Sequence, residues 1–200
     1  VDFTSTYGSI KRKNVKRVVS RSTSISWKII TVISFQSSII FTTVQQNKIE
    51  IYTDGSSRGN PGPGGYGVLL IWGKIQKELS QGYRLTTNNR MELMAVIAAL
   101  DALKKNDLEL VIHSDSNYVV KAVMQKWLDK WIKTNFRGGI KNSDLWLRYH
   151  ALSKKHRIHF KWVKGHAENP MNNRCDELAT EAADGKHLLT DEGYEKMQGK

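Results

Sequence analysis

Two acidic residues stand at equivalent places in the sequence. Asp54 follows the alternating segment 48–53, KIEIYT, and Asp115 follows the apolar segment 108–114, LELVIHS. Both segments have the pattern of β-strands, and each acid is preceded by Thr or Ser and followed by Gly or Ser. If the two strands are parallel neighbours, the carboxylates lie side by side at the sheet edge where ligands of open α/β sheets bind.

Neighbouring carboxylates predict a metal site, because like charges repel one another unless a cation lies between them. Glu92, early in the helical segment 90–105, and Asp176, in the helical segment 171–184, are further candidates. Carboxylates without a Cys/His cluster are hard oxygen ligands, which favour Mg²⁺ or Mn²⁺ over zinc. Beside a basic surface, such a site indicates metal-assisted phosphoryl chemistry.

A glycine-rich stretch, 54–67 (DGSSRGNPGPGGYG), allows a different interpretation because it contains a literal G-x-G-x-x-G. A dinucleotide cradle needs its glycines between a strand and a helix, since the phosphates bind at the helix N-terminus. Here the segment 66–72, YGVLLIW, has a strand pattern, and no G-K-[ST] follows. We therefore interpret the stretch as a hairpin whose glycines keep bulk away from Asp54.

The elements that would position these residues form an α/β sheet of mixed strand direction. Strands are expected at 48–53, 66–72, 77–85, 108–114 and 158–163, and helices at 90–105, 117–133, 144–155 and 171–184. The order β-β-β-α-β-α-α-β-α predicts a five-stranded sheet that begins with an antiparallel meander and has its fourth strand parallel to its first. Ser143 is the expected cap of the third helix, and residues 186–200 are expected to be loosely ordered.

Composition indicates a globular domain with a polyanionic partner. The 200 residues include 31 Lys and Arg against 19 Asp and Glu, a net charge of +12, and segment 121–164 holds twelve bases and two acids. Nucleic acid and anionic membrane would both suit this charge, but the apolar segment 27–44 is too interrupted by polar residues to span a membrane. The single cysteine, Cys175, excludes an intrachain disulfide, fits a reducing compartment and is expected to be a small buried helix residue.

Residues 1–47 differ from the rest of the chain. They are rich in Ser and Thr and carry seven bases and one acid. This composition is typical of an organelle transit peptide, although a disordered or non-native leader is the plainer expectation. We expect a domain at 48–186, a C-terminal tail at 187–200 and a cytoplasmic location, with targeting to an organelle left open.

Four separated stretches carry a more specific signal. They are YTDGSSRGNPGPGGYG (52–67), TTNNRMELMA (86–95), SDS (114–116) and WVKGHAENPMNNRCDELA (162–179). In this order and at these spacings they resemble type 1 ribonuclease H, most closely the bacterial enzymes, over about three quarters of the chain. The resemblance implies the ribonuclease H-like fold, with helices on both faces of the sheet. It also implies endonucleolytic hydrolysis of the RNA strand of an RNA–DNA hybrid, which leaves 5′-phosphate and 3′-hydroxyl ends.

The resemblance implies roles for individual residues as well. In that family four carboxylates hold two Mg²⁺ ions, and the matching positions are Asp54, Glu92, Asp115 and Asp176. His166 matches a loop histidine that helps to deprotonate the attacking water or assists product release. Contacts in the minor groove of the hybrid are implied for Asn60, Asn88 and Asn89, a contact near a phosphate of the DNA strand for Thr87, and an RNA contact for Asn117.

The basic segment at about 121–143 matches the handle with which members of this kind grip the hybrid. Lys126 and Lys130 would supply salt-dependent, sequence-independent affinity through phosphates. Trp127 and Trp131 lie on the apolar face of the same helix, so we interpret both as mainly structural, with Trp127 also among the implied substrate contacts. Nothing in the sequence predicts more than a monomer.

Three other functions fit parts of the sequence. A catalytically silent hybrid-binding module would gain from replacing its acids, so the complete acidic set argues against it. The ribonuclease H domain of a reverse transcriptase remains an alternative, which a handle and a finished C-terminus make less attractive. A transposase or integrase-like strand transferase spaces its acids differently and carries a further DNA-binding domain.

Overall fold

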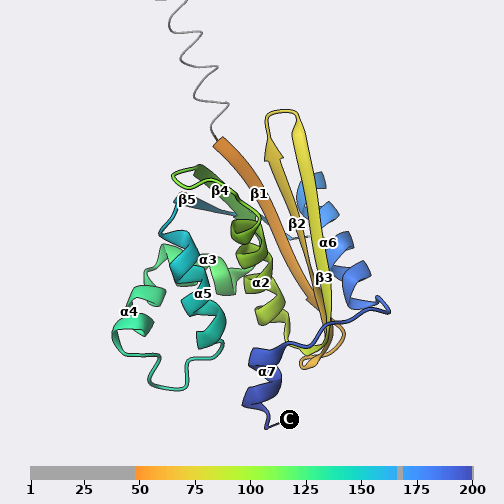
Figure 1. Ribbon diagram of the computed structural model, residues 1–200, viewed down its shortest axis with the longest axis vertical. Helices are drawn as coiled ribbons and strands as arrows, with labels where there is room; N and C mark the ends of the chain where they lie inside the picture. The colour runs from red at the N-terminus through yellow and green to blue at the C-terminus, as the bar shows by residue number, and fades with distance from the viewer. Residues whose placement is uncertain (1–47, 166–168, 200) are drawn as a thin grey trace, which may run out of the picture. The chain divides into compact units, whose positions relative to one another are not determined.

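The computed structural model describes residues 48–165 and 169–199, which form a five-stranded sheet with helices on both faces (Figure 1). The strands are β1 (Lys48–Ser57), β2 (Gly62–Trp72), β3 (Ile75–Thr86), β4 (Glu109–Ser114) and β5 (Arg157–Trp162). The helices are α2 (Asn88–Asp101), α3 (Asn117–Met124), α4 (Trp127–Lys133), α5 (Ser143–Ser153), α6 (Pro170–Ala183) and α7 (Glu192–Met197). The predicted α/β fold with a mixed sheet is confirmed.

The sheet has the strand order β3-β2-β1-β4-β5. β1, β2 and β3 form the predicted antiparallel meander, whereas β4 runs parallel to β1 and β5 runs parallel to β4. β1 is longer than its alternating pattern predicts, because it continues past Asp54 to Ser57 while paired with β2. Its pairing with β4, however, ends where Thr53 lies beside Ser114. The sheet therefore opens at Asp54, as the sequence predicts, although the strand itself does not end there.

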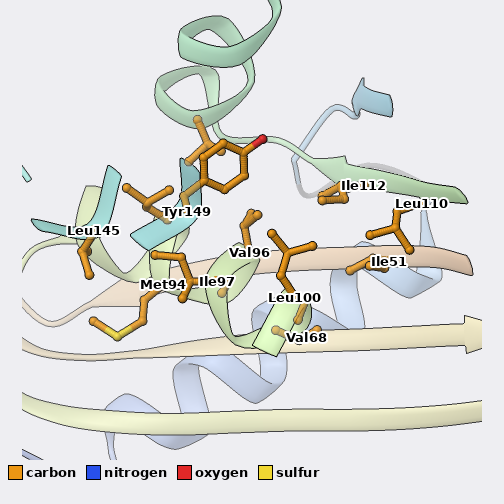
Figure 2. Packing of buried hydrophobic residues seen from close by; sticks show 14 of the residues in the cluster. Ile51, Val68, Met94, Val96, Ile97, Leu100, Leu110, Ile112, Leu145 and Tyr149 are labelled. Carbon is orange, nitrogen blue, oxygen red and sulfur yellow. The ribbon is translucent and has the colours of Figure 1, made fainter. Parts of the chain in front are cut away.

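Helices cover the two faces of the sheet unequally. α2 packs on β1 and β2 and is itself covered by α5, while α6 lies against β1, β2 and β3 on the other face (Figure 1). Between α2 and the sheet lies the main apolar core, in which Ile51, Val68, Ile97, Leu110 and Ile112 have no exposed surface (Figure 2). Burial of this surface is the main source of stability for the domain. Within the described residues, no helix is long and apolar enough to cross a bilayer.

One glycine of the hairpin explains how α6 comes so close to the sheet. A Cβ added to Gly67 would overlap the carbonyl oxygen of Cys175 and crowd the side chain of Leu178, both on α6. Gly67 lies in β2 and pairs with Asp54 of β1. Its missing side chain therefore lets a helix, rather than a nucleotide phosphate, approach the strand that carries Asp54.

The helix predicted at 117–133 is in fact two helices, α3 and α4. Lys126, between them, has a φ of 56° in the left-handed region, where a right-handed helix cannot continue. The break redirects α4, so that the ring of Trp131 lies 5.5 Å from that of Trp146 on α5. The apolar residues keep their four-residue spacing in the sequence across this break, so the sequence pattern alone does not reveal the break.

Two other expectations are wrong. Asn142, not Ser143, precedes the first turn of α5, and its side chain bonds to the Tyr118 hydroxyl and to Arg90 instead of capping the helix. The segment expected to be a loosely ordered tail contains α7 and the buried side chain of Asp191. In both cases the partners are distant in sequence, so that local propensity does not indicate the contact.

The packing of α4 and α5 yields a stability prediction centred on Trp146. Its ring is fully buried, and its indole N–H donates to the Tyr118 hydroxyl at 2.8 Å. Trp146→Phe should lower the free energy of unfolding by about 2–4 kcal/mol, because it leaves a cavity in the core and removes one of the two hydrogen bonds to the Tyr118 hydroxyl. Leu147→Ala, at the adjacent half-exposed position, is the control and should change stability little. Equal losses for the two variants in urea denaturation would contradict this account.

Candidate active site

Three carboxylates from three different elements meet at the edge where β1 and β4 separate. Asp54 comes from β1, Asp115 follows β4, and Glu92 comes from the second turn of α2. One oxygen of each lies within 4.8 Å of the others, a spacing at which a single metal ion could be held. The sequence predicts the meeting of Asp54 and Asp115 from strand positions, whereas it offers Glu92 only as a candidate.

Gly55 brings Glu92 to Asp54. It follows Asp54 in β1, and a Cβ at this position would overlap the main-chain nitrogen of Glu92. Any side chain here would therefore push α2 away from the strand, and with it the Glu92 carboxylate. The main-chain N–H of Gly55 also donates to Asp54 Oδ1 at 2.7 Å, which orients that carboxylate.

The carboxylates are short of hydrogen-bond donors. Asp54 and Glu92 are each 7% exposed. Glu92 Oε1 accepts from the Asn88 side chain at 3.3 Å, but Glu92 Oε2 and Asp115 Oδ1 are buried without a donor among the described residues. Buried carboxylate oxygens are normally hydrogen-bonded, so these two are suited to a cation.

Burial and mutual repulsion alter the acidity of the group. Burial raises the pKa of Asp54 to about 7, with further increases from the negative charges of Asp115 and Asp176, while the Gly55 N–H acts in the opposite direction. Burial, followed by the charges of Asp54 and Asp115, raises the pKa of Glu92 well above its ordinary value. The folded chain therefore disfavours full ionisation of the group unless positive charge is added.

Asp176 lies on α6, on the other side of Asp54 from α2, and is partly exposed. It is not in the tight group of three, although its charge contributes to the raised pKa of Asp54. His166 lies outside the described residues. Cys175, next to Asp176, is fully buried, and burial raises the pKa of its thiol to about 12, so that a thiolate nucleophile is excluded.

The predicted substrate contacts fall into two groups. Asn60 lies between β1 and β2, and Thr87, Asn88 and Asn89 lie at the start of α2: Asn88 bonds to Glu92 through its side chain, and its N–H donates to Asn60 Oδ1 at 3.3 Å. Asn117 is exposed at the first turn of α3, two residues beyond Asp115.

The second group lies on and beside α4. Lys126 and Lys130 are exposed to solvent, and Trp127 is 37% exposed with its ring 6.3 Å from that of Trp131. Trp131 and Leu128 face inward, as the structural interpretation of this apolar face predicts.

A cavity of about 350 Å³ adjoins the asparagines. Its walls include Asn60, Thr87 and Asn89 on one side and Lys141, Asn142 and Tyr194 on the other. The last three are missing from the predicted site. The loop expected at FRGGIKNS contains Lys141, which is exposed, and Asn142, which is in fact buried, but nothing in the sequence indicates that Tyr194 would reach this place.

Comparisons with known proteins concern the sequence and fold of the chain as a whole. A model of the RNase H family matches residues 46–184, from the start of β1 through α6. A protein named ribonuclease H from Idiomarina loihiensis is 49% identical over 150 residues, which are 73% of this chain and 94% of that protein. The crystal structure of LC9-RNase H1, a type 1 RNase H with the type 2 active-site motif, aligns with a TM-score of 0.65 and 31% identity over 78% of this chain and 82% of that one. LC11-RNase H1 in complex with an RNA/DNA hybrid aligns with a TM-score of 0.53 and 27% identity, over 68% of this chain and 96% of that one.

The crowded carboxylates predict an unusual pH dependence of stability. Because the pKa of Asp54 is about 7 in the folded chain against an ordinary 3.8, the unfolded chain loses this proton first. Stability in EDTA should therefore fall as the pH rises from about 4 to about 7. At pH 8 in EDTA, Asp54→Asn should raise Tm by several degrees, because it removes one of the repelling charges, and the gain should vanish near pH 4.

Scanning calorimetry with and without Mg²⁺ measures both effects. Mg²⁺ should stabilise the unaltered protein more at pH 8 than at pH 5, and should stabilise Asp54→Asn less at pH 8. Glu181→Gln removes an exposed acid from α6 and serves as the charge-matched control. An Asp54→Asn variant that is less stable than the unaltered protein at pH 8 in EDTA would show that repulsion does not dominate the site.

Proposed function

The chain belongs to the ribonuclease H family and is an endoribonuclease acting on RNA–DNA hybrids, and we propose that it hydrolyses the RNA strand with two divalent metal ions, leaving 5′-phosphate and 3′-hydroxyl ends. The observation that carries the mechanism is the group of three carboxylates, which includes two buried oxygens without a donor among the described residues. Such a group is costly unless cations neutralise it. An all-oxygen ligand set favours Mg²⁺, with Mn²⁺ as the alternative.

Each carboxylate has a place in this proposal. Asp54, Glu92 and Asp115, whose oxygens lie together, would hold metal, and Asp176 on α6, whose charge acts on Asp54, would contribute the fourth carboxylate. Bound metal would lower the pKa of the attacking water and stabilise the leaving 3′ oxygen. The Gly55 N–H keeps Asp54 oriented, and the Asn88 side chain holds one oxygen of Glu92, so both carboxylates are positioned before substrate arrives.

Recognition of the RNA strand is assigned to the asparagines. Asn60, Asn88 and Asn89 offer neutral amides that can donate to and accept from 2′-hydroxyls, the group that distinguishes RNA from DNA. Thr87 lines the adjoining cavity and would contact a phosphate of the DNA strand, and Asn117 would contact the RNA beside Asp115.

The α3–α4 region would supply affinity rather than selectivity. Lys126 and Lys130 are exposed and can pair with phosphates of any sequence, and the partly exposed Trp127 belongs to the same first turn of α4. His166 would transfer a proton at the attacking water or assist product release. Hydrolysis is favoured over a catalytically silent binding module because burial of these acids costs stability and does nothing to attract a polyanion.

The decisive experiment incubates the protein with labelled RNA–DNA hybrid, duplex RNA and duplex DNA, in Mg²⁺, Mn²⁺ or EDTA. We expect cleavage of the RNA strand of the hybrid alone, and only with metal. Asp54→Asn should abolish turnover while hybrid binding stays close to that of the unaltered protein, and Glu181→Gln should match the unaltered protein in both. Cleavage of duplex DNA, or hybrid cleavage that EDTA leaves unchanged, would refute the proposal.

His166 provides a separate prediction. A proton-transfer group that assists chemistry carried by metal ions contributes about 10²–10⁴-fold. His166→Ala should therefore slow turnover within that range without abolishing it, and should leave hybrid affinity unchanged. A turnover number equal to that of the unaltered protein would remove His166 from the mechanism.

A further inference from the structure

The segment that follows α6 is bound tightly to the domain. Leu189 forms a parallel bridge with Tyr83 of β3: its N–H donates to the Gly82 carbonyl and its carbonyl accepts from the Arg84 N–H, both at 2.9 Å. The chain then turns at Asp191 and forms α7. α7 therefore begins from an anchored point beside the last strand of the meander (Figure 1).

Asp191 joins this segment to the start of α2. Its carboxylate is 3% exposed and accepts from Arg90 Nε, Arg90 Nη2 and the Thr86 hydroxyl, each at 2.7 Å. Arg90 is fully buried and also donates to Asp144 on α5. Because Arg90 follows Asn89 in α2, its buried pair with Asp191 joins the α2 N-terminus to the start of α7.

A second ion pair fixes the far end of α7. Arg84 of β3 donates to both oxygens of Glu195, with Nε at 2.9 Å and Nη2 at 2.6 Å. The Glu195 carboxylate is 11% exposed, whereas the Arg84 side chain is 59% exposed. A bidentate pair of this kind fixes orientation as well as distance.

Held by these two ion pairs, α7 presents one side to the cavity next to the asparagines. Tyr194, Met197 and Gln198 line it opposite Asn60 and Thr87. Among the described residues of the lining, Lys141 is the single charged side chain, so the cavity suits an anionic group. Met197 is 55% exposed, which leaves this wall of the cavity accessible from solvent.

We propose that α7 is part of the substrate-binding surface, and that Arg84 and Asp191 are positioning residues which hold it there. The occupant of the cavity is the sugar–phosphate backbone of the bound hybrid, so this inference rests on the proposed function. The carboxylates have no described contact with α7. Displacing α7 therefore weakens hybrid binding and leaves turnover at saturation unchanged.

The first test introduces charge into the cavity wall. Gln198→Glu places a negative charge in the lining, and Lys196→Gln makes the same change in net charge outside the lining, where Lys196 forms an exposed ion pair with Glu192 of the same helix. Gln198→Glu should raise KM for the hybrid about fivefold with kcat unchanged, because it repels a backbone phosphate. Lys196→Gln should leave KM close to that of the unaltered protein.

The second test loosens the helix without altering the cavity. Arg84→Gln breaks the pair with Glu195, and Arg174→Gln breaks an equally bidentate pair with Glu78, which joins α6 to β3 away from the cavity. Arg84→Gln should raise KM about threefold to tenfold with kcat unchanged, whereas Arg174→Gln should alter Tm alone. A purely structural role for α7 would give the two variants the same kinetic constants.

Hybrid affinity measured by fluorescence anisotropy in EDTA separates this inference from the proposed function. Failure of the unaltered protein to cleave the hybrid would refute the proposed function, while the affinities of the four variants would still report on α7. Kd and KM unchanged in both Gln198→Glu and Arg84→Gln would overturn the inference. So would an equal loss of affinity in Gln198→Glu and Lys196→Gln, since the effect would then come from net charge alone.

Discussion

Repulsion among three neighbouring carboxylates, two of them buried, is the constraint on which the rest of this structure depends. Asp54, Glu92 and Asp115 have oxygens within 4.8 Å of one another, and burial raises the pKa of Asp54 and of Glu92. Left to themselves, such groups would separate or take up protons. They stay together because their elements are held by packing elsewhere: ten of the fourteen residues of α2 are buried, and β4 pairs with β1 up to the point where the acids begin.

Two buried charged residues near the start of α2, Arg90 and Glu92, differ in how fully their polar atoms are hydrogen-bonded. Arg90 is surrounded by the carboxylates of Asp144 and Asp191, so that its donors are satisfied within the protein. Glu92 keeps one oxygen without a donor among the described residues. A satisfied buried charge fixes structure, whereas an unsatisfied one is available for a ligand. The first turns of α2 therefore carry both a residue that stabilises the fold, Arg90, and a candidate metal ligand, Glu92.

The sequence predicts the parts of the fold that depend on local patterns. Alternation and helical spacing predict the five strands, and equivalent strand ends predict that Asp54 and Asp115 meet. The assignment of Glu92 and Asp176 to the site depended on the family resemblance, because the sequence alone does not show which face of a helix lies against the sheet. The break at Lys126, the use of Asn142 and the anchoring of α7 escaped prediction for one physical reason. Each depends on partners far along the chain, and Asp191 and Arg90 are 101 positions apart.

The acidic site and the basic residues of the surface are separate, as binding of a polyanionic substrate requires. The carboxylates would repel phosphates, so attraction has to come from elsewhere, and the exposed Lys126, Lys130 and Lys141 lie outside the acidic group. Between the acids and the cavity lie neutral amides, of which Asn88 bonds to both Glu92 and Asn60. Amides can approach a phosphate backbone without repulsion and can read hydroxyl groups. Affinity, recognition and hydrolysis therefore rest on different side chains, held together by one sheet edge and the start of one helix.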